Sequence, residues 1–332
     1  MRTHYPRTPH LPWSPGATAD DVRVGELSGL AGRAVVVTEK LDGENTTLYP
    51  DGLHARSLDS AHHPSRTWVK ALHGRVAARI PQGWRVCGEN VFARHSLAYD
   101  DLQSWFYAFS VWAGERCLDW DATVRFATRL GVPVPPVLWR GRFDERAIRA
   151  LAVDPQRQEG YVVRTVEGFD RAEFPRRVAK WVRRGHVTSD VHWASAPVVP
   201  NGRGPAAALW DVRSGGPVDA AGLAAALGTS GGSGLIDHRA LDAALARLDG
   251  LGRTGDARLA GAAAAVLHGG PRRACLAARL AEPLGMPLGR RVADLVGLHR
   301  VVGRPYPDDE RRAGLCWLAE AADLGVLHAV AD

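Results

Sequence analysis

Residues 1–198 alternate short runs of β-branched and aromatic residues with Gly, Pro and Asp. Apolar runs of about four to eight residues, bounded by turn residues, are typical of β-strands. The pattern therefore predicts antiparallel pairing, with some helix between the strands. The predicted strands are Arg33–Thr38, Thr46–Tyr49, Trp84–Cys87, Trp105–Trp112, Glu159–Thr165 and Val178–Arg183.

Three segments of the same region predict helices, at Arg66–Arg79, Asp119–Leu130 and Asp144–Leu151. The last begins with acidic residues, which interact favourably with the positive end of a helix dipole. The first residues include YPRTPHLPWSPG, a stiff proline-rich arm that we expect to pack across the region that follows.

A change in composition divides the chain. Residues 197–205, PVVPNGRGP, predict a linker, and the chain beyond it is rich in Ala and Leu with helical periodicity. We expect two domains, residues 1–198 and an all-helical domain of residues 199–332. A flexible insertion, GTSGGSG, occupies positions 228–234. The predicted helices are Asp237–Leu248, Asp256–Leu267, Pro271–Leu280 and Leu288–Leu298, and a further helix start lies at Pro307.

Composition narrows the function classes. The formal net charge of +6 and the pI of about 9.4 favour a polyanionic partner, although a general preference for Arg explains the same excess. No apolar stretch resembles a signal peptide or is long enough to span a bilayer, so we expect a cytoplasmic protein that does not act on a membrane. The cysteines are too scattered for a zinc site or a disulfide framework: they are Cys87, Cys117, Cys275 and Cys316.

The stretch VVVTEKLDGENTT places one lysine, Lys40, at the end of an apolar strand. A lysine amine becomes a nucleophile when desolvation or nearby positive charge lowers its pKa. The carboxylates of Glu39, Asp42 and Glu44 would by themselves raise that pKa, and they make sense if they hold a divalent metal ion, whose charge reverses the sign. Gly43 would let the backbone approach a ligand closely. An exposed turn gives the same local pattern.

Five further segments each pair a strand-like run with a charged or aromatic residue. In order they are HARS, RVCGENVFARHS, SWFYAFSVW, QEGYVVRT and VAKWVRRGHV. With the Lys40 stretch they resemble the ordered motifs of covalent nucleotidyltransferases, and more closely those of ATP-dependent RNA ligases of the phage RNA ligase 2 type. The resemblance covers roughly residues 33–195. It implies an α+β fold, a nucleotidyltransferase domain of ATP-grasp-like antiparallel sheets with helices, followed here by the all-α C-terminal domain.

The resemblance assigns roles to individual residues. Lys40 is the residue that is adenylylated. The other nucleotide contacts that the resemblance implies are Glu39 and Asp42 beside the nucleophile, Asn45 orienting the nucleotide, Arg56 on the ribose or a phosphate, Glu89 on the ribose hydroxyls, Phe109 stacked on adenine, and Lys180 on the α-phosphate.

The implied cofactors are ATP and Mg²⁺ or Mn²⁺, with Glu159 and Asp42 as oxygen ligands of the metal. The implied reaction joins RNA ends that carry a 5'-phosphate and a 3'-hydroxyl, and an end-healing kinase or phosphatase is a possible partner. Basic residues next to the motifs form a candidate RNA-binding rim; they are His62, His63, Arg66, Arg94 and His95.

Two departures from the family pattern stand out. Ser110 occupies the position after the stacking aromatic, where an acid is common, and Val182 occupies the position of a second lysine in the last motif. From the residues alone, structural alternatives also stay open: Phe109 in a core, Glu89 at a turn and Glu159 at a strand start.

Three alternative functions remain. One is a DNA ligase or a capping-type nucleotidyltransferase; Asn45, and the helical pattern where such enzymes carry an oligonucleotide-binding barrel, favour RNA ligation instead. The second is a non-catalytic RNA-binding protein on the same fold. The third is an enzyme that forms a Schiff base on its lysine, which the ordered acids and the late lysine fit poorly.

Overall fold

The structure is a computed structural model, and it describes residues 2–58, 62–185, 197–217, 219, 221 and 222. Contacts divide the chain into two compact units. The first unit comprises Met1–Asp100, Trp105–Ala127 and Pro133–Gly202, and the second comprises Asp101–Ser104, Thr128–Val132 and Arg203–Asp332. The helices predicted beyond residue 222 lie outside the described residues. Within those residues, no helix is both long and apolar enough to cross a lipid bilayer.

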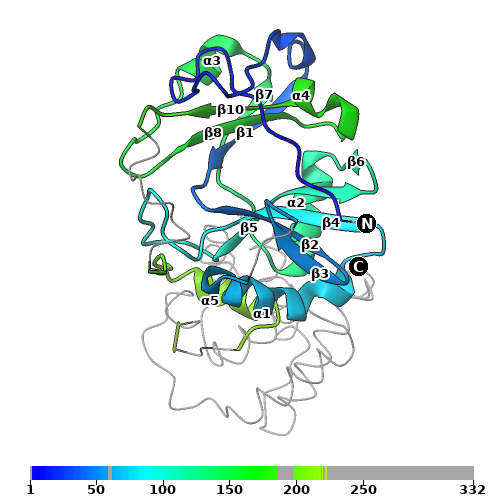
Figure 1. Ribbon diagram of the computed structural model, residues 1–332, viewed down its shortest axis with the longest axis vertical. Helices are drawn as coiled ribbons and strands as arrows, with labels where there is room; N and C mark the ends of the chain where they lie inside the picture. Colours follow the sequence, from blue (N-terminus) through cyan, green and yellow to red (C-terminus); the bar gives the residue numbers. More distant parts are fainter. Residues whose placement is uncertain (1, 59–61, 186–196, 218, 220, 223–332) are drawn as a thin grey trace, which may run out of the picture. The chain divides into compact units, whose positions relative to one another are not determined.

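The first unit contains a four-stranded antiparallel sheet with the strand order β10-β8-β1-β7. Figure 1 shows it above a second sheet of the same unit. Strand β1, Ala34–Lys40, is central, and Val35, Val36 and Val37 are fully buried. The other strands are β7 (Val137–Arg142), β8 (Gly160–Thr165) and β10 (Val178–Val182).

The side chains of the four-stranded sheet alternate between its two faces, as the pleat of a strand requires. One face forms a hydrophobic core with Leu11, Leu30 and Ile148 of the segments that cover it. The buried strand residues of this core are Val35, Val37, Tyr161, Val163 and Ala179. The opposite face therefore carries Thr38 and Lys40 of β1, which are offset from these valines by one residue.

The second sheet has six antiparallel strands in the order β3-β2-β4-β5-β6-β9. Val178 of the four-stranded sheet packs into one cluster with Cys87, Trp112 and Phe169 of this sheet, so apolar packing joins the two sheets. The strands are β2 (Glu44–Tyr49), β3 (Gly52–Ala55), β4 (Trp84–Asn90), β5 (Phe106–Ala113), β6 (Arg116–Cys117) and β9 (Phe169–Asp170).

The helices are short and connect the strands. Helix α1 buries Val69, Leu72 and Val76, an i, i+3, i+7 stripe that faces the protein interior. Asp144 caps α3 by accepting a hydrogen bond from the Ala147 N–H at 3.1 Å. The α-helices are α1 (Thr67–Val76), α2 (Trp120–Leu130), α3 (Glu145–Arg149), α4 (Phe174–Arg177) and α5 (Ala207–Arg213), and 3₁₀ helices lie at Leu27–Gly29, Pro64–Arg66, Ala77–Arg79 and Arg171–Glu173.

The antiparallel α+β architecture confirms the predicted fold of this region, and each predicted strand and helix before residue 198 corresponds to an observed element. The pattern missed the strands β3, β6, β7 and β9 and the four-residue helix α4. Strand β3 has only four residues, and β7 is an edge strand whose side chains are all at least partly exposed. Neither strand therefore shows a buried apolar run.

A boundary between the two units falls within the predicted linker at 197–205: the first unit ends at Gly202, and Arg203 belongs to the second. The segment before this boundary is packed. Asn201 is buried, and its side-chain amide donates hydrogen bonds to the carbonyls of Val91 and Ala93. Its main-chain carbonyl accepts a hydrogen bond from the Trp105 indole at 2.9 Å. One asparagine thus satisfies several buried backbone groups, which composition does not reveal.

The N-terminal arm, defined here as residues 2–11, packs across the first unit as the sequence predicted. Near one end its backbone pairs with β10: the Lys180 N–H donates to Pro9, and the Leu11 N–H donates to Lys180. At the other end the Arg2 guanidinium donates to the Leu53 carbonyl beside β2 and β3. Figure 1 shows the arm running from the upper sheet to the lower sheet.

Two glycine substitutions should change stability in opposite directions. A Cβ at Gly160 would collide with the backbone carbonyl of Trp181 on β10, whereas a Cβ at Gly74 in α1 would meet no atom within 4 Å. We expect Gly160→Ala to destabilise the protein by about 2 kcal/mol, and Gly74→Ala to stabilise it by about 1 kcal/mol. Denaturant unfolding measures both. A stable Gly160→Ala protein would contradict the close pairing of β8 with β10.

Candidate active site

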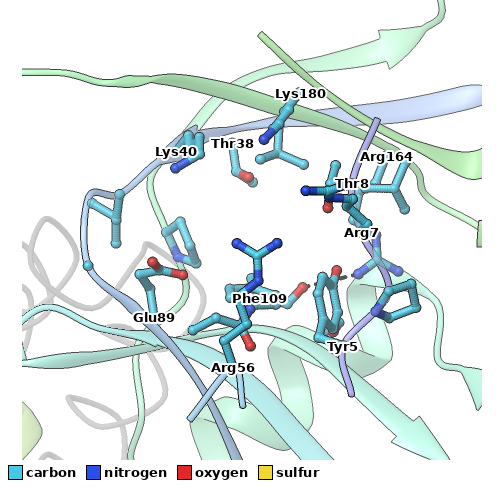
Figure 2. Close-up of a pocket in the computed structure, with 18 of the residues that line it drawn as sticks. Tyr5, Arg7, Thr8, Thr38, Lys40, Arg56, Glu89, Phe109, Arg164 and Lys180 are labelled. Carbon is cyan, nitrogen blue, oxygen red and sulfur yellow. Dashed lines mark hydrogen bonds between the residues drawn. The ribbon is translucent and has the colours of Figure 1, made fainter. Parts of the chain in front are cut away.

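A cavity of about 910 Å³ lies between the two sheets of the first unit. Its size is within the usual range for a small-molecule site. Figure 2 shows side chains from three sources meeting there: Lys40 and Lys180 from the four-stranded sheet, Glu89 and Phe109 from the six-stranded sheet, and Tyr5 from the N-terminal arm.

Lys40 is the last residue of β1, at the point where the chain leaves one sheet for the other. Its side chain is 24% exposed, and its amine forms an ion pair with Glu159, which is 8% exposed. Glu159 directly precedes β8, whose Gly160 pairs with Lys40 across the sheet. The ion pair therefore follows from strand register.

The turn after Lys40 is fixed by contacts within the chain. A Cβ at Gly43 would lie 2.5 Å from the Asn90 carbonyl, so this position needs glycine to let β4 approach. Gly43 also lines the cavity, and its close approach to a ligand stays a prediction. Asp42 Oδ2 accepts hydrogen bonds from the N–H groups of Ser96 and Leu97 at 2.8 and 2.9 Å.

Charge governs the protonation of Lys40. Burial lowers the pKa of Lys40. The nearby carboxylates of Glu159, Glu89 and Asp42 raise it by more, so that the net pKa lies above the usual value for lysine. Lys40 is therefore a protonated cation at neutral pH when no other charge is bound. Of the three acids that the sequence argument placed around Lys40, Asp42 contributes to this rise, and Glu159 and Glu89 contribute more.

Glu89 experiences the opposite balance. Burial is the largest cause that raises its pKa to about 8, with Glu159 and Asp42 adding to the rise and Lys40 opposing it. Near neutral pH this carboxyl therefore holds a proton in part of the molecules. A protonated carboxyl donates a hydrogen bond, whereas an ionised one only accepts.

Lys180 lies on the same sheet face as Lys40. Thr38, Val162 and Lys180 stand side by side on three neighbouring strands, and all three line the cavity. Burial lowers the pKa of Lys180, and the like charge of Lys40 lowers it further. A partly buried cation beside another cation is stabilised by a bound anion.

Phe109 lines the cavity at an irregularity of β5. Gly88 pairs with Ala108 and Cys87 pairs with Ser110, so Phe109 is the extra residue of a β-bulge. A bulge re-aims the side chain it carries. The Phe109 carbonyl accepts a hydrogen bond from the Arg164 guanidinium at 3.2 Å. The Phe109 ring meets the ring of Tyr5 edge-on, with centroids 5.1 Å apart.

The remaining cavity residues come from β2, from β4 and from segments beside them. Asn45 is directly opposite Glu89 in the β2–β4 register. Arg56 follows β3, and Figure 2 shows its guanidinium extended into the cavity. Arg66 also lines the cavity, but its Nε and Nη2 donate hydrogen bonds to the Glu44 carboxylate, at 2.7 and 2.5 Å. Its charge is therefore largely neutralised.

Four of the sequence-predicted residues have a different placement. Glu39 lines the cavity, but its carboxylate accepts a hydrogen bond from Gln158, and the strand alternation puts its side chain on the face opposite Lys40. Asp42, Arg94 and His95 are not among the cavity-lining residues. Their predicted contacts with nucleotide, metal or RNA stay predictions.

The donor atoms fit a divalent metal ion only in part. Within the described residues, no group of three His, Cys, Asp or Glu side chains is arranged to hold a metal by itself. Glu89 and Glu159 do lie close enough to Lys40 to raise its pKa. Mg²⁺ is commonly bound by one or two carboxylates together with substrate phosphates, and this pair of acids suits such a shared site.

Several cavity residues were missed by sequence reasoning. The period-two alternation of strands could have identified three of them. Thr38 lies two residues before Lys40 and therefore on the same face of β1, and Val162 and Arg164 are two residues apart on one face of β8. Tyr5, Arg7 and Thr8 of the arm gave no such signal, since only the long-range pairing of the arm with β10 brings them to the cavity.

The geometry defines a class of site: a lysine paired with a buried acid, inside a basic cavity between two antiparallel sheets. Residues 33–182 match the RNA ligase family model. This match covers the segment whose motifs resemble the family. No curated protein sequence matches the chain.

Solved structures of Naegleria gruberi RNA ligase are similar to parts of the chain. A mutant with ATP and Mn is 16% identical with a TM-score of 0.36, and the enzyme with PPi is 17% identical with a TM-score of 0.36; each match covers 48% of this chain and 52% of the other. Another mutant with ATP and Mn is 15% identical, with a TM-score of 0.37, over 55% and 60%. The chain thus spans about half the length of the first two structures.

The pKa of Glu89 predicts a pH dependence of stability. Because the folded state raises this pKa from 4.5 to about 8, the folded protein binds more protons than the unfolded chain between these values. The contribution of Glu89 to the free energy of unfolding is therefore fully present below pH 4.5 and is lost as the pH rises towards 8.

We expect Glu89→Gln to flatten the decline of stability over this range, in urea unfolding measured without nucleotide or divalent metal. Glu26→Gln changes an exposed glutamate outside the cavity lining and is the matched control. Identical pH profiles for Glu89→Gln and wild type would contradict the raised pKa.

Proposed function

We propose that this protein is an ATP-dependent RNA ligase that forms AMP and acts through an adenylate on Lys40. The observation that supports it most is the position of Lys40, paired with Glu159 in a cavity that Lys180 and Arg56 also line. Most of the residues that line this cavity lie within the segment that matches the RNA ligase family model. A phosphate-bearing substrate has the charge that such a cavity accepts.

The use of lysine supports a chemical role for Lys40. The 332-residue sequence contains lysine only at Lys40, Lys70 and Lys180, while arginine supplies the other positive charges. Arginine and lysine both form ion pairs, but an arginine side chain does not lose its proton in a protein. Two of the three lysines line one cavity, which is expected where an amine must become a nucleophile.

The first step of the proposed reaction joins Lys40 to AMP. The unprotonated Nζ attacks the α-phosphorus of ATP, a phosphorus–nitrogen bond forms, the bond to the bridging oxygen breaks, and pyrophosphate leaves. The amine loses its protons to solvent on the way to the phosphoramidate. A divalent metal bound with Glu159 and Glu89 would supply the positive charge that offsets these acids and so lowers the pKa of Lys40.

The cavity walls suit the parts of ATP. Phe109, aimed into the cavity by its bulge, offers an apolar face to adenine, and Glu89 opposite Asn45 is placed for the ribose hydroxyls. Lys180 and Arg56 provide the charge for phosphate. Arg164 is a positioning residue, because its hydrogen bond to the Phe109 carbonyl fixes the bulge.

In the later steps, the AMP moves from Lys40 to the 5'-phosphate of an RNA strand, and a 3'-hydroxyl then attacks that phosphate and displaces AMP. The predicted substrate is RNA with these two ends, and an end-healing kinase or phosphatase would prepare them. The helical domain predicted for residues 199–332 is proposed to grip the RNA. A non-catalytic RNA-binding protein remains the alternative, and it predicts no adenylate on Lys40.

Loss of the Lys40 amine should abolish covalent labelling. We expect wild type to retain label from α-labelled ATP after denaturation, in the presence of Mg²⁺ or Mn²⁺ but not after chelation. Lys40→Ala should lower the labelled fraction at least about 1000-fold, since its nucleophile is absent. Lys70→Ala, which removes an exposed lysine of α1, should be labelled like wild type.

Peptide mass spectrometry identifies the modified residue, because the sequence offers only three lysines. AMP found on Lys180, or label kept by Lys40→Ala, would contradict the assignment.

The preferences for ATP over GTP and for RNA ends over DNA ends test the alternative functions of DNA ligase and capping-type nucleotidyltransferase. We expect label from ATP at least about tenfold faster than from GTP, because a cavity that hydrogen-bonds one base leaves polar groups unpaired with the other. We also expect nicks with an RNA 3'-end to be sealed faster than nicks with a DNA 3'-end, measured by gel electrophoresis. Preference for GTP would indicate a capping-type enzyme, and preference for DNA ends would indicate a DNA ligase.

A further inference from the structure

The N-terminal arm connects two residues that the proposed function places on phosphate. Its backbone pairs with Lys180 on both sides, through the Pro9 carbonyl at 2.9 Å and the Leu11 N–H at 2.8 Å. Further along, the Arg56 carbonyl forms a hydrogen bond with the His4 imidazole at 2.9 Å. Residues 4–8 between these anchors line the cavity. The arm is therefore part of the cavity wall, although it precedes the segment that matches the RNA ligase family.

Most charged side chains of the cavity already have partners. Lys40 is paired with Glu159, and Arg66 is paired with Glu44. Arg164 donates to the carbonyls of Phe109 and Leu118. Lys40 and Arg66 are therefore neutralised by their own carboxylates, whereas Arg164 keeps its charge but has its donors occupied by backbone carbonyls.

The acids near the arm and at the end of β1 are engaged as well. The Asp21 carboxylate accepts hydrogen bonds from the backbone and hydroxyl of Thr18 and lies 3.6 Å from the His10 ring. The Glu39 carboxylate accepts a hydrogen bond from Gln158. Neither acid is within ion-pair distance of the arginine that the arm places in the cavity.

Three cations remain for a bound anion: Arg7, Arg56 and Lys180. Each lines the cavity, and within the described part of the chain no carboxylate lies within 4.0 Å of their charged nitrogens. Figure 2 shows Arg7 across the cavity from Lys40, with Lys180 between them along the upper wall. ATP carries a triphosphate whose charge matches such an arrangement.

Arg7 has the position of a group that binds the leaving pyrophosphate. In phosphoryl and nucleotidyl transfer, the attacking and leaving atoms lie roughly in line on opposite sides of the phosphorus. If Lys40 attacks the α-phosphorus, the β- and γ-phosphates point away from Lys40, towards the wall that carries Arg7. We propose that Arg7 of the N-terminal arm binds the β- or γ-phosphate of ATP, an inference that rests on the proposed function for the identity of the nucleotide.

Binding of ATP and AMP tests this assignment without any reaction. In the full-length Lys40→Ala protein, which cannot form the adenylate, isothermal titration calorimetry should show that adding Arg7→Ala raises the Kd for ATP by about 10- to 100-fold, the loss expected for a charge-assisted hydrogen bond. The Kd for AMP should change less than about twofold, because AMP lacks the two outer phosphates. Arg7→Lys should recover part of the ATP affinity.

The matched control is Arg146→Ala, which removes the same charge from an exposed position of α3 outside the cavity lining. It should leave both affinities unchanged. Equal losses for ATP and AMP would overturn the proposal and assign Arg7 a role in folding the arm. Unchanged ATP affinity with weaker binding of a 5'-phosphorylated RNA would also overturn it and assign Arg7 to the RNA phosphate.

The same measurements separate this proposal from the proposed function. If wild type forms no adenylate while Arg7→Ala still weakens ATP but not AMP, the ligase assignment fails and the phosphate contact stands. If wild type is adenylylated and Arg7→Ala binds ATP like its parent, the ligase assignment stands and the role of Arg7 is refuted.

Discussion

The ion pair between Lys40 and Glu159 is the interaction on which the site depends. A lysine amine held between two sheets loses water, and burial alone would lower its pKa. The carboxylates around it reverse that effect and keep the amine charged. In the reaction that we propose, the same acids would keep the amine unreactive until the positive charge of a bound metal ion offsets them.

Strand connectivity explains how one residue can occupy this position. Strand β1 belongs to the four-stranded sheet, and β2, which follows after three residues, belongs to the six-stranded sheet. The intervening turn is fixed by Gly43 against β4 and by Asp42 against the backbone of Ser96 and Leu97. Because backbone contacts hold the turn, Lys40 lies at the junction of the sheets without relying on its own side chain for placement.

Sequence reasoning predicted those features of the fold and the site that depend on the local pattern of residues. The apolar run of β1 and the period-two alternation located the strand and the cavity-facing side of Lys40 and Lys180. It failed where placement depends on distant partners. The bulge at Phe109 becomes visible only in the pairing of β4 with β5, and the buried carbonyls that hold Asn201 lie about 110 positions away in sequence. The arm residues reach the cavity only because β10 pairs with residues near the start of the chain.

The arm also bears on the departure from the family pattern in the last motif. Val182 takes the place of a second lysine there, and it is buried, with its carbonyl accepting a hydrogen bond from the Gly16 N–H. A lysine at this buried position would have to bury its charge, at a considerable cost in free energy. Arg7 places a different cation in the cavity, because the pairing of the arm with β10 brings residues 4–8 to the cavity wall.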